Sequence, residues 1–406
     1  MSRVVITGMG IYASLGENKE AVCDSLFQGR SGIIFRPERK VLGYRSGLTG
    51  WVNRPDLKNA LSRRSRIMLA EQGEYAYVAT KEALAHAGLT EEDITQQETG
   101  IIYGNDTSAK AVIEGIDILR ERKDTMLIGS GSVFQVLNST VTMNLSTIFK
   151  LKGVNFSISA ACASGSHAIG LGYMFIKQGL QQRIICGGAQ EVNDFAMPNF
   201  DALGTFSLRE EEPTKASRPF DKNRDGLVPG GGAATVVLES LESAQARGAD
   251  IIAEVTGYGF SSNGEHISNP SVEGQVRSIE RALADAGIAA DAIGYINAHA
   301  TSTPAGDSSE AAAIHQVFGD KTPVSSTKSM TGHECWMAGA SEVVYSLLMM
   351  AHDFMAPNIN FEEPDQHSAK INILRETRRQ SFDTLLSNSF GFGGTNSSLV
   401  LCKWRP

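Results

Sequence analysis

The chain is predicted to fold as an α/β protein built from two similar halves. Short apolar strands alternate with helical patterns along its 406 residues, which is typical of mostly parallel sheets covered by helices. A short motif also recurs, because residues 5–11 (Val-Ile-Thr-Gly-Met-Gly-Ile) resemble residues 254–260 (Glu-Val-Thr-Gly-Tyr-Gly-Phe). No long linker divides the chain, so the halves are expected at residues 1–250 and 251–406, with the join near residues 240–252.

The individual elements follow from the spacing of apolar residues. Besides the two motif strands, strands are expected at residues 99–103, 183–186, 233–238 and 397–402. Helices are expected at residues 65–87, 166–181 and 274–286.

Composition excludes several classes of protein. No stretch approaches the roughly 20 apolar residues of a membrane helix, and the chain is expected to enter its first strand without a signal peptide. Five scattered cysteines with no CxxC pair argue against disulfides or structural zinc, and predict a cytoplasmic location. The net charge of -8 argues against nucleic acid as the main partner, whereas a local basic patch could still dock an acidic protein.

Cys162 stands where a strand is expected to meet a helix. A β-branched and aromatic run at residues 154–158 leads into it, and small residues follow. Unpaired N–H groups and the dipole at a helix start favour negative charge, and such conditions lower a cysteine pKa and produce a thiolate nucleophile. A cysteine by itself is more often a small core residue, so other segments must decide its role.

Three further segments carry residue types that are suited to chemistry. The first ends a strand in His299 and continues with hydroxyls and turn residues. The second holds Lys328 and His333 and runs into a small-residue helix. The third, residues 387–396, is rich in glycine, which permits close backbone approaches.

Each segment also has a structural interpretation. A histidine at a strand end is more often structural than catalytic, and a glycine-rich run can be a tight turn. A zinc site made of Cys162, His299, His333 and Cys335 matches no common metal spacing. The occurrence of all four segments in one chain favours the functional interpretation.

Together the segments resemble the elongating β-ketoacyl-acyl-carrier-protein synthases, the type I and II condensing enzymes of bacterial fatty acid synthesis. The matching runs lie at residues 161–165, 220–226, 299–304, 328–333 and 388–396. The resemblance implies the thiolase fold, in which two duplicated α/β halves form a five-layered α-β-α-β-α arrangement. It also implies a dimer, an acyl carrier protein as partner, no bound metal, and no cofactor beyond the carrier's phosphopantetheine arm.

The resemblance implies a role for each reacting group. Cys162 takes an acyl group from a carrier-protein thioester, and a malonyl carrier protein then loses CO2 to give the attacking carbanion. His299 and His333 donate hydrogen bonds to the malonyl thioester carbonyl as it becomes an enolate. The N–H groups of Cys162 and Phe392 form the oxyanion hole at the acyl thioester.

Two residues are expected behind the histidines. The Lys328 ammonium is expected to keep His333 neutral, and Glu310 is expected to orient Lys328.

Further residues match binding positions of the family. Thr301 and Thr303 match groups that bind the phosphopantetheine arm, and Phe392 matches a gate beside the acyl pocket. Arg63 and Arg66 match a basic patch that docks the carrier protein, although the same run could be a solvated helix face.

Related families fit less well. A thiolase needs a second cysteine in the glycine-rich C-terminal loop, where this chain has Phe390 and Phe392. The initiating type III synthases carry asparagine in place of His333. A non-catalytic, carrier-binding chain-length-factor subunit normally lacks the nucleophile. A heterodimer of this chain, as the active subunit, with such a relative remains an alternative to a homodimer.

The chain departs from the family near the expected acyl pocket. Trp336 and Met337 replace small residues after His333, so their surroundings must have changed to fit them. Asn105 and Thr107 stand where the family has glycine or aliphatic residues, and Phe206 stands where leucine is common. We therefore expect Asn105, Thr107, Phe206 and Trp336 to contact the substrate.

These departures suggest an unusual acyl chain. A polar-tipped, unsaturated or aryl-bearing chain fits them better than a saturated one, as in the condensing enzymes of aryl polyene clusters. The alternative is an ordinary fatty acid synthase whose pocket has drifted.

Overall fold

The computed structural model describes residues 2–405. The strands are β1 (Val4–Ala13), β2 (Ile33–Phe35), β3 (Leu48–Gly50), β4 (Thr99–Gly104), β5 (Asn155–Ile158), β6 (Arg183–Gln190), β7 (Gly232–Ser240), β8 (Ala253–Ser262), β9 (Tyr295–Asn297), β10 (Pro323–Ser325), β11 (Asn372–Ile373), β12 (Thr384–Phe390) and β13 (Thr395–Lys403).

The α-helices are α1 (Lys19–Gln28), α2 (Pro37–Val41), α3 (Arg63–Arg66), α4 (Glu71–His86), α5 (Glu91–Gln96), α6 (Ala109–Arg122), α7 (Ser132–Val136), α8 (Thr140–Ile148), α9 (Ser164–Lys177), α10 (Pro198–Ala202), α11 (Leu241–Ala246), α12 (Val272–Ala286), α13 (Pro304–Phe318), α14 (Lys328–Thr331) and α15 (Ala338–Ala351). Two of the short 3-10 turns matter for the site, η4 (Cys335–Met337) and η6 (Phe392–Gly394).

A continuous sheet of 11 strands runs through the molecule in the order β11-β10-β9-β12-β13-β8-β1-β7-β6-β4-β5. Its two outer parts are parallel, but all pairs from β12 to β6 are antiparallel. The expectation of mostly parallel sheets is therefore wrong for the centre. One reason is that β12 and β13 are joined by a short turn, and a short turn can connect only antiparallel neighbours.

The recurring motif marks a structural repeat. Counted outward from the central β1–β8 pair, the order β1-β7-β6-β4-β5 mirrors the order β8-β13-β12-β9-β10. The motif glycines Gly10 and Gly259 have the same role in the two halves, because the absence of a side chain lets a helix lie directly on the strand. A Cβ atom at Gly10 would lie 2.1 Å from the carbonyl oxygen of Ala79 in α4, and one at Gly259 would lie 2.0 Å from that of Ser278 in α12.

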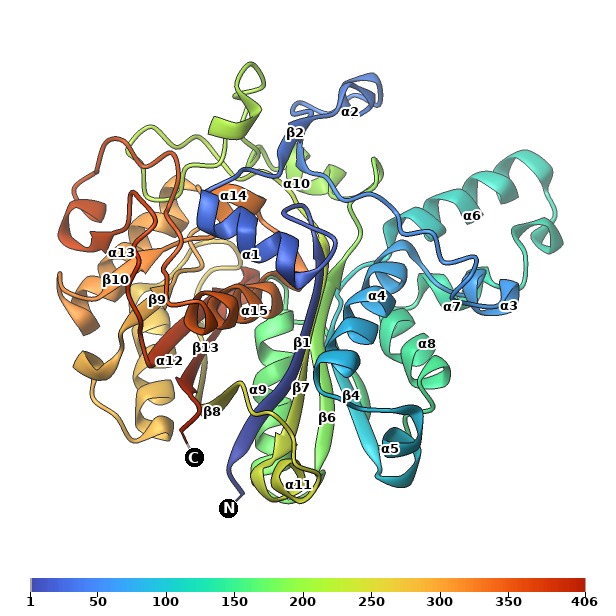
Figure 1. Cartoon of the computed structure of the whole chain (residues 1–406). Coiled ribbons are helices and arrows are strands. Elements are labelled where there is room, and N and C mark those ends of the chain that lie inside the picture. Colours follow the sequence, from blue (N-terminus) through green and yellow to red (C-terminus); the bar gives the residue numbers. More distant parts are fainter. Residues whose placement is uncertain (1, 406) are drawn as a thin grey trace.

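The helices complete the expected five layers (Figure 1). α4 covers β1 and β7 on one outer face, and α12 covers β8 and β13 on the other. α9 and α15 pack on each other between the two parts of the sheet. The α-β-α-β-α arrangement of a thiolase fold is thus confirmed, and the central layer brings Cys162 before α9 close to the turn η4 before α15.

One expected helix is broken. Residues 65–87 form α3 and α4 with a break between Arg66 and Glu71. Amide side chains donate hydrogen bonds to carbonyl groups at the break: Gln135 donates to Ile67 O at 3.0 Å, and Asn144 donates to Met68 O at 3.1 Å. Residues outside this segment therefore stabilise the break, which local spacing cannot reveal. Among residues 2–405, none of the helices combines the length and apolar character of a membrane span.

Candidate active site

Cys162 lies at the expected corner between β5 and α9. The residue before it, Ala161, is held in the left-handed region with φ of +46°, a conformation that costs a non-glycine residue on the order of 1–3 kcal/mol. Neighbouring side chains hold this corner. Asp106 accepts the Ala161 N–H at 3.1 Å, and the Ser164 hydroxyl accepts the Ala160 N–H at 2.9 Å.

The thiol itself does not match the expectation of a lowered pKa. Burial raises the pKa of Cys162 to about 12, and the side chain is only 5% exposed. The Lys328 charge and the N–H groups of Cys162 and Phe392 act in the opposite direction, but the cost of desolvating a thiolate outweighs them. The resting group is therefore a thiol, with two backbone N–H groups at its sulfur.

His299 and His333 lie together in the site. Their ring centroids are 5.3 Å apart and their planes are nearly perpendicular, at 88°. Burial, and then the charge of Lys328, lower the pKa of both rings well below the ordinary value. Both imidazoles are therefore neutral at physiological pH and each can donate one ring N–H.

Lys328 lies fully buried beneath the histidines, but its partner is not the expected one. Its ammonium forms an ion pair with Glu342 of α15. Glu310 instead accepts the backbone N–H groups of His299 at 2.9 Å and Ala300 at 2.6 Å. The expectation that Glu310 orients Lys328 is wrong, because Lys328 pairs with Glu342 and the Glu310 carboxylate instead holds the main chain that carries His299.

Glu342 was missed, although the sequence contains a signal for it. It is the one charged residue of the apolar helix α15, and a buried charge in such a helix requires a partner. Burial raises the pKa of Glu342, and the Lys328 ammonium opposes that rise.

A cavity of about 270 Å³ opens onto these groups. Cys162, His299, His333, Thr301, Thr303 and Phe392 all line it. The two threonine hydroxyls lie 3.1 Å apart on one wall. The structure thus places six of the sequence-predicted site residues around one cavity.

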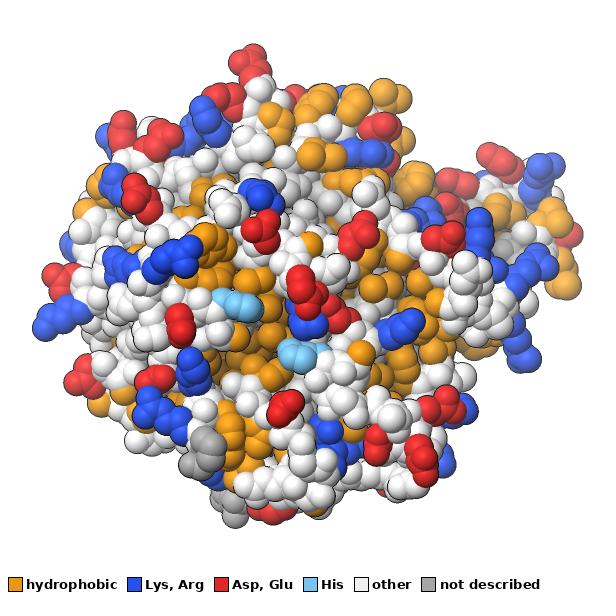
Figure 2. Space-filling view, in the orientation of Figure 1, with side chains coloured by type: hydrophobic (Ala, Val, Ile, Leu, Met, Phe, Trp, Pro, Cys, Tyr) orange, Lys and Arg blue, Asp and Glu red, His pale blue; other side chains and the backbone are white. Residues whose placement is uncertain are grey.

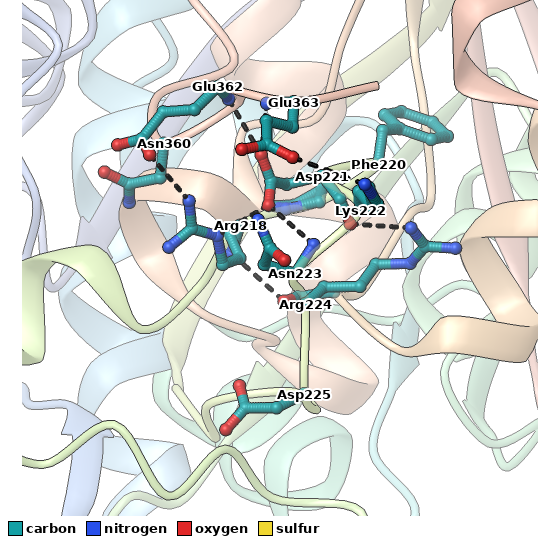
Figure 3. Close-up of polar contacts among 12 residues, drawn as sticks. Arg218, Phe220, Asp221, Lys222, Asn223, Arg224, Asp225, Asn360, Glu362 and Glu363 are labelled. Carbon is teal, nitrogen blue, oxygen red and sulfur yellow. Dashed lines mark hydrogen bonds and ion pairs between the residues drawn. The ribbon is translucent and has the colours of Figure 1, made fainter. Parts of the chain in front are cut away.

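The run at residues 218–226 forms a network of polar contacts (Figure 3), which also reaches the segment that follows His299. Asp221 accepts the side chain of Arg218 at 3.0 Å and the backbone N–H of Glu362 at 2.8 Å. Arg224 donates to the carbonyl oxygens of Thr303 and Pro304, at 3.3 and 2.9 Å.

The same network holds a strained residue of the catalytic segment. Ser302 has φ of +71°; its hydroxyl accepts the backbone N–H of Arg218 at 3.0 Å, and its carbonyl accepts that of Gly226 at 3.1 Å. The Phe-Asp-Lys-Asn-Arg-Asp-Gly run therefore positions residues 299–304 rather than touching the cavity.

The four departures that were expected to contact the substrate lie behind the cavity wall. Asn105, Thr107, Phe206 and Trp336 are not among the residues that line the cavity, so the expectation that they contact the substrate stays a prediction. Asn105 is buried and donates to Asn138 O at 2.7 Å. Thr107 and Trp336 form a pair, because the indole N–H donates to the threonine hydroxyl at 3.1 Å.

Phe200 of α10 lies at the cavity, whereas Asn105, Thr107, Phe206 and Trp336 do not. It lines the cavity and stacks on Phe392 with centroids 5.6 Å apart. Its sequence surroundings contain no signal for this position.

Arg63 and Arg66 lie on the short helix α3, away from the cavity. Within residues 2–405, neither forms an ion pair, and Arg63 is exposed. Within the same range, no three histidine, cysteine or acidic side chains are placed to hold a metal ion.

Comparison with protein families agrees with this geometry. The model "Beta-ketoacyl synthase, N-terminal domain" matches residues 1–244, and "Beta-ketoacyl synthase, C-terminal domain" matches residues 252–362. The chain is 43% identical over 409 residues to 3-oxoacyl-[acyl-carrier-protein] synthase 1 of Haemophilus influenzae and to that of Escherichia coli K12, and each alignment covers 100% of both proteins.

Solved structures show the same architecture over the whole chain. A β-ketoacyl synthase from Burkholderia phymatum superposes with a TM-score of 0.94 at 37% identity, and the ishigamide ketosynthase/chain length factor with 0.91 at 30%, each over 100% of both chains. A type II polyketide ketosynthase, solved in complex with its acyl-carrier protein, gives 0.88 at 29%, also over 100% of both chains. The chain therefore belongs to the β-ketoacyl synthase family.

Proposed function

We propose that the chain is a β-ketoacyl-acyl-carrier-protein synthase that extends an acyl group by decarboxylative condensation with a malonyl carrier protein. The observation that carries this proposal is the single cavity that unites the thiol of Cys162 with the neutral pair His299 and His333. A nucleophile next to two uncharged N–H donors suits this two-stage reaction.

In the first stage, the sulfur of Cys162 attacks the thioester of an acyl carrier protein. A sulfur–carbon bond forms at Cys162, the bond to the carrier's sulfur breaks, and the thiol proton of Cys162 leaves with that sulfur. The N–H groups of Cys162 and Phe392 stabilise the tetrahedral oxyanion. Because burial keeps the pKa of Cys162 at about 12, proton loss accompanies the attack.

In the second stage, the malonyl thioester loses CO2. The electron pair of the broken carbon–carbon bond moves onto the thioester oxygen, where His299 and His333 donate hydrogen bonds to the enolate. The enolate carbon then attacks the acyl group on Cys162, the bond from that carbon to the cysteine sulfur breaks, and the released thiolate takes up a proton from solvent. Neutral rings serve this step because they donate without protonating the carbanion, and Thr301 and Thr303 hold the phosphopantetheine arm.

We further propose that Arg63 and Arg66 dock the acyl carrier protein. Arg63 is exposed and α3 carries three arginines within four residues, so it offers a local basic surface on a chain with a net charge of -8. Five free cysteines support a reducing cytoplasm as the place of action.

The protein is proposed to work as a homodimer. β5 ends the large sheet, and its Phe156 is 51% exposed; an open apolar edge favours pairing with a second chain. The projecting arm of residues 109–137 adds Met126 and Leu127, which are 84% and 57% exposed, and apolar side chains are visible along this arm (Figure 2). A related chain-length-factor subunit is the second candidate for this partner.

We also propose that this chain consists of two halves, residues 1–250 and 251–406, which the mirrored strand order supports.

Mass spectrometry of the intact protein tests the proposed reaction. Acyl carrier protein should add one acyl group to wild type and none to Cys162→Ala, whereas Cys162→Ala should still decarboxylate malonyl carrier protein. An acyl adduct that persists in Cys162→Ala would show that another residue is the nucleophile.

A further inference from the structure

Trp336 is fixed at both ends. Its indole N–H donates to Thr107 Oγ1 at 3.1 Å, and its side chain is 4% exposed. Its carbonyl oxygen lies against two glycines, since a Cβ atom would lie 3.0 Å from it at Gly165 and 2.7 Å from it at Gly188. Movement of the ring would therefore break its hydrogen bond to Thr107, and Gly165 in α9 and Gly188 in β6 confine the backbone.

Phe200 separates Trp336 from the cavity. Its ring stacks on Phe392 at 5.6 Å and meets the indole at 6.3 Å and an interplanar angle of 61°. Phe200 belongs to the five-residue helix α10, which lies between left-handed residues, Met197 with φ of +68° and Gly204 with φ of +75°. A rotation of this one side chain would join the cavity to the indole face.

The side chains packed beyond Phe200 are apolar and reach the nucleophile. Cys162 packs in one cluster with Met197, Phe206, Leu227 and Trp336, and Phe200 packs against the same cluster. The threonine-lined part of the cavity instead suits the polar phosphopantetheine arm. An acyl chain on the sulfur would bury its apolar surface by entering the cluster.

We propose that Trp336 is a specificity-determining residue, and that the acyl chain on Cys162 lies in a slot that rotation of the Phe200 side chain opens beside the fixed indole face. Such a slot accepts flat, conjugated or aryl acyl chains better than saturated ones. This inference rests on the proposed function and names its substrate class.

The physical reason is the shape and stiffness of the chain. Aromatic faces attract other π systems in offset or edge-to-face contacts, and a stiff conjugated chain loses less rotational freedom on binding than a saturated one. A gain of roughly 3- to 10-fold for each favourable ring contact is expected from such pairs. Thr107 contributes by holding the indole in one orientation.

The test compares acyl groups of equal carbon number on the acyl carrier protein. Hexanoyl is paired with 2,4-hexadienoyl, and 3-phenylpropanoyl is paired with cinnamoyl; kcat/KM for acylation of Cys162 is measured by intact-protein mass. For each pair, kcat/KM of the conjugated acyl group is divided by kcat/KM of the saturated one. The two thioesters differ in intrinsic reactivity, but this difference is the same for every protein, so it cancels when the ratio of a variant is compared with that of wild type.

Trp336→Leu is expected to lower this ratio by about 10-fold. Trp336→Phe, which keeps an aromatic face, should retain most of it, and Thr107→Val, which removes the hydrogen-bond acceptor at nearly equal volume, should lower it partly. Trp404→Leu is the matched control, because Trp404 lies beside Arg3 near the chain end and should leave the ratio unchanged.

Two results would overturn the inference. One is an unchanged ratio in Trp336→Leu and Thr107→Val. The other is an equal rise for both members of each pair in Trp336→Leu, which would make Trp336 only a plug that limits chain length. In both cases acylation of Cys162 still supports the proposed function, whereas wild type that no acyl carrier protein acylates would contradict the function itself.

Discussion

Lys328 and Glu342 form an ion pair beneath the active-site histidines, and each side chain is only 1% exposed. The Lys328 charge lowers the pKa of both histidines and acts on the buried carboxyls of Glu310 and Glu342 in the sense that favours their ionised form. This one ammonium therefore links the protonation of the histidines to that of the acidic residues below them.

Glu342→Gln should destabilise the protein strongly. The substitution keeps the shape but leaves the buried ammonium of Lys328 without its counter-charge, and breaking a buried pair in this way costs about 3–5 kcal/mol. Thermal and denaturant unfolding measure the loss. Glu273→Gln, at an exposed pair with Arg277 on α12, should cost no more than about 0.5 kcal/mol. Equal losses in the two variants would contradict the importance of burial.

Glu310→Gln should weaken malonyl decarboxylation more than acylation. The carboxylate accepts the backbone N–H groups of His299 and Ala300 on separate oxygens, and the Asn388 side chain as well, whereas an amide can accept only with its one oxygen. One buried N–H then loses its partner at about 1–3 kcal/mol, and the His299 ring shifts. Rates of CO2 release and of Cys162 acylation are compared in the same variant. A parallel fall of both rates would indicate general misfolding instead of a displaced histidine.

His299→Ala and His333→Ala should each lose decarboxylation while Cys162 can still be acylated. Each variant removes one donor to the developing enolate, and such a donor is worth about 100- to 1000-fold in rate. Radiolabelled CO2 release measures the loss, and intact mass confirms the acyl group on Cys162. Condensation by His299→Ala at nearly the wild-type rate would mean that the assigned mechanism is wrong.

The buried carboxyl of Glu334 should make stability depend on pH. Burial raises the pKa of Glu334 to about 7, although Ser341 and Tyr345 donate hydrogen bonds to it. Its folded pKa lies above the unfolded value of about 4.3, so its contribution is fully present below that value and is lost as the pH rises through about 7. Glu334→Gln should therefore lose less stability than wild type between these pH values. Unfolding curves at several pH values test this, and an unchanged slope in Glu334→Gln would refute it.

The reacting groups could be predicted from the sequence because each lies in a short run between two regular elements, where the chain changes direction. Cys162 and His299 follow the strands β5 and β9, whereas His333 lies between the end of α14 and the turn η4. The pKa of Cys162 could not be predicted from the sequence. The sequence indicates a helix start, whose N–H groups lower the pKa, but it does not show the distant side chains that bury the thiol and raise it.

Pairings between distant side chains were less predictable. Glu310 and Glu342 are both acidic residues on helices near Lys328 in sequence, and spacing does not show which helix passes beneath it. The Thr107–Trp336 hydrogen bond joins the two halves of the chain over 229 positions. Each residue was recognised as a departure from the family, but their direct contact follows only from the packing of the central layer.

The motif glycines provide a last prediction, on the fold itself. Gly10→Ala should destabilise the first half, because the new methyl group would lie 2.1 Å from the carbonyl oxygen of Ala79 and α4 would have to move off the sheet. Overpacking of this kind costs about 1–3 kcal/mol or more. Gly259→Ala should do the same in the second half, where the contact is to Ser278 O at 2.0 Å.

Gly115→Ala is the matched control for both substitutions. Gly115 lies within α6, and its nearest neighbour would be 3.5 Å from the added methyl group. Alanine in a helix interior is favoured over glycine by about 0.5–1 kcal/mol, so this variant should be unchanged or slightly more stable in a thermal melt. If Gly10→Ala and Gly259→Ala melted like Gly115→Ala, the close approach of helix to strand would not be the reason that both halves carry Thr-Gly-x-Gly. If only the two strand variants lost stability, and by similar amounts, the repeated motif would be explained by the same contact made twice.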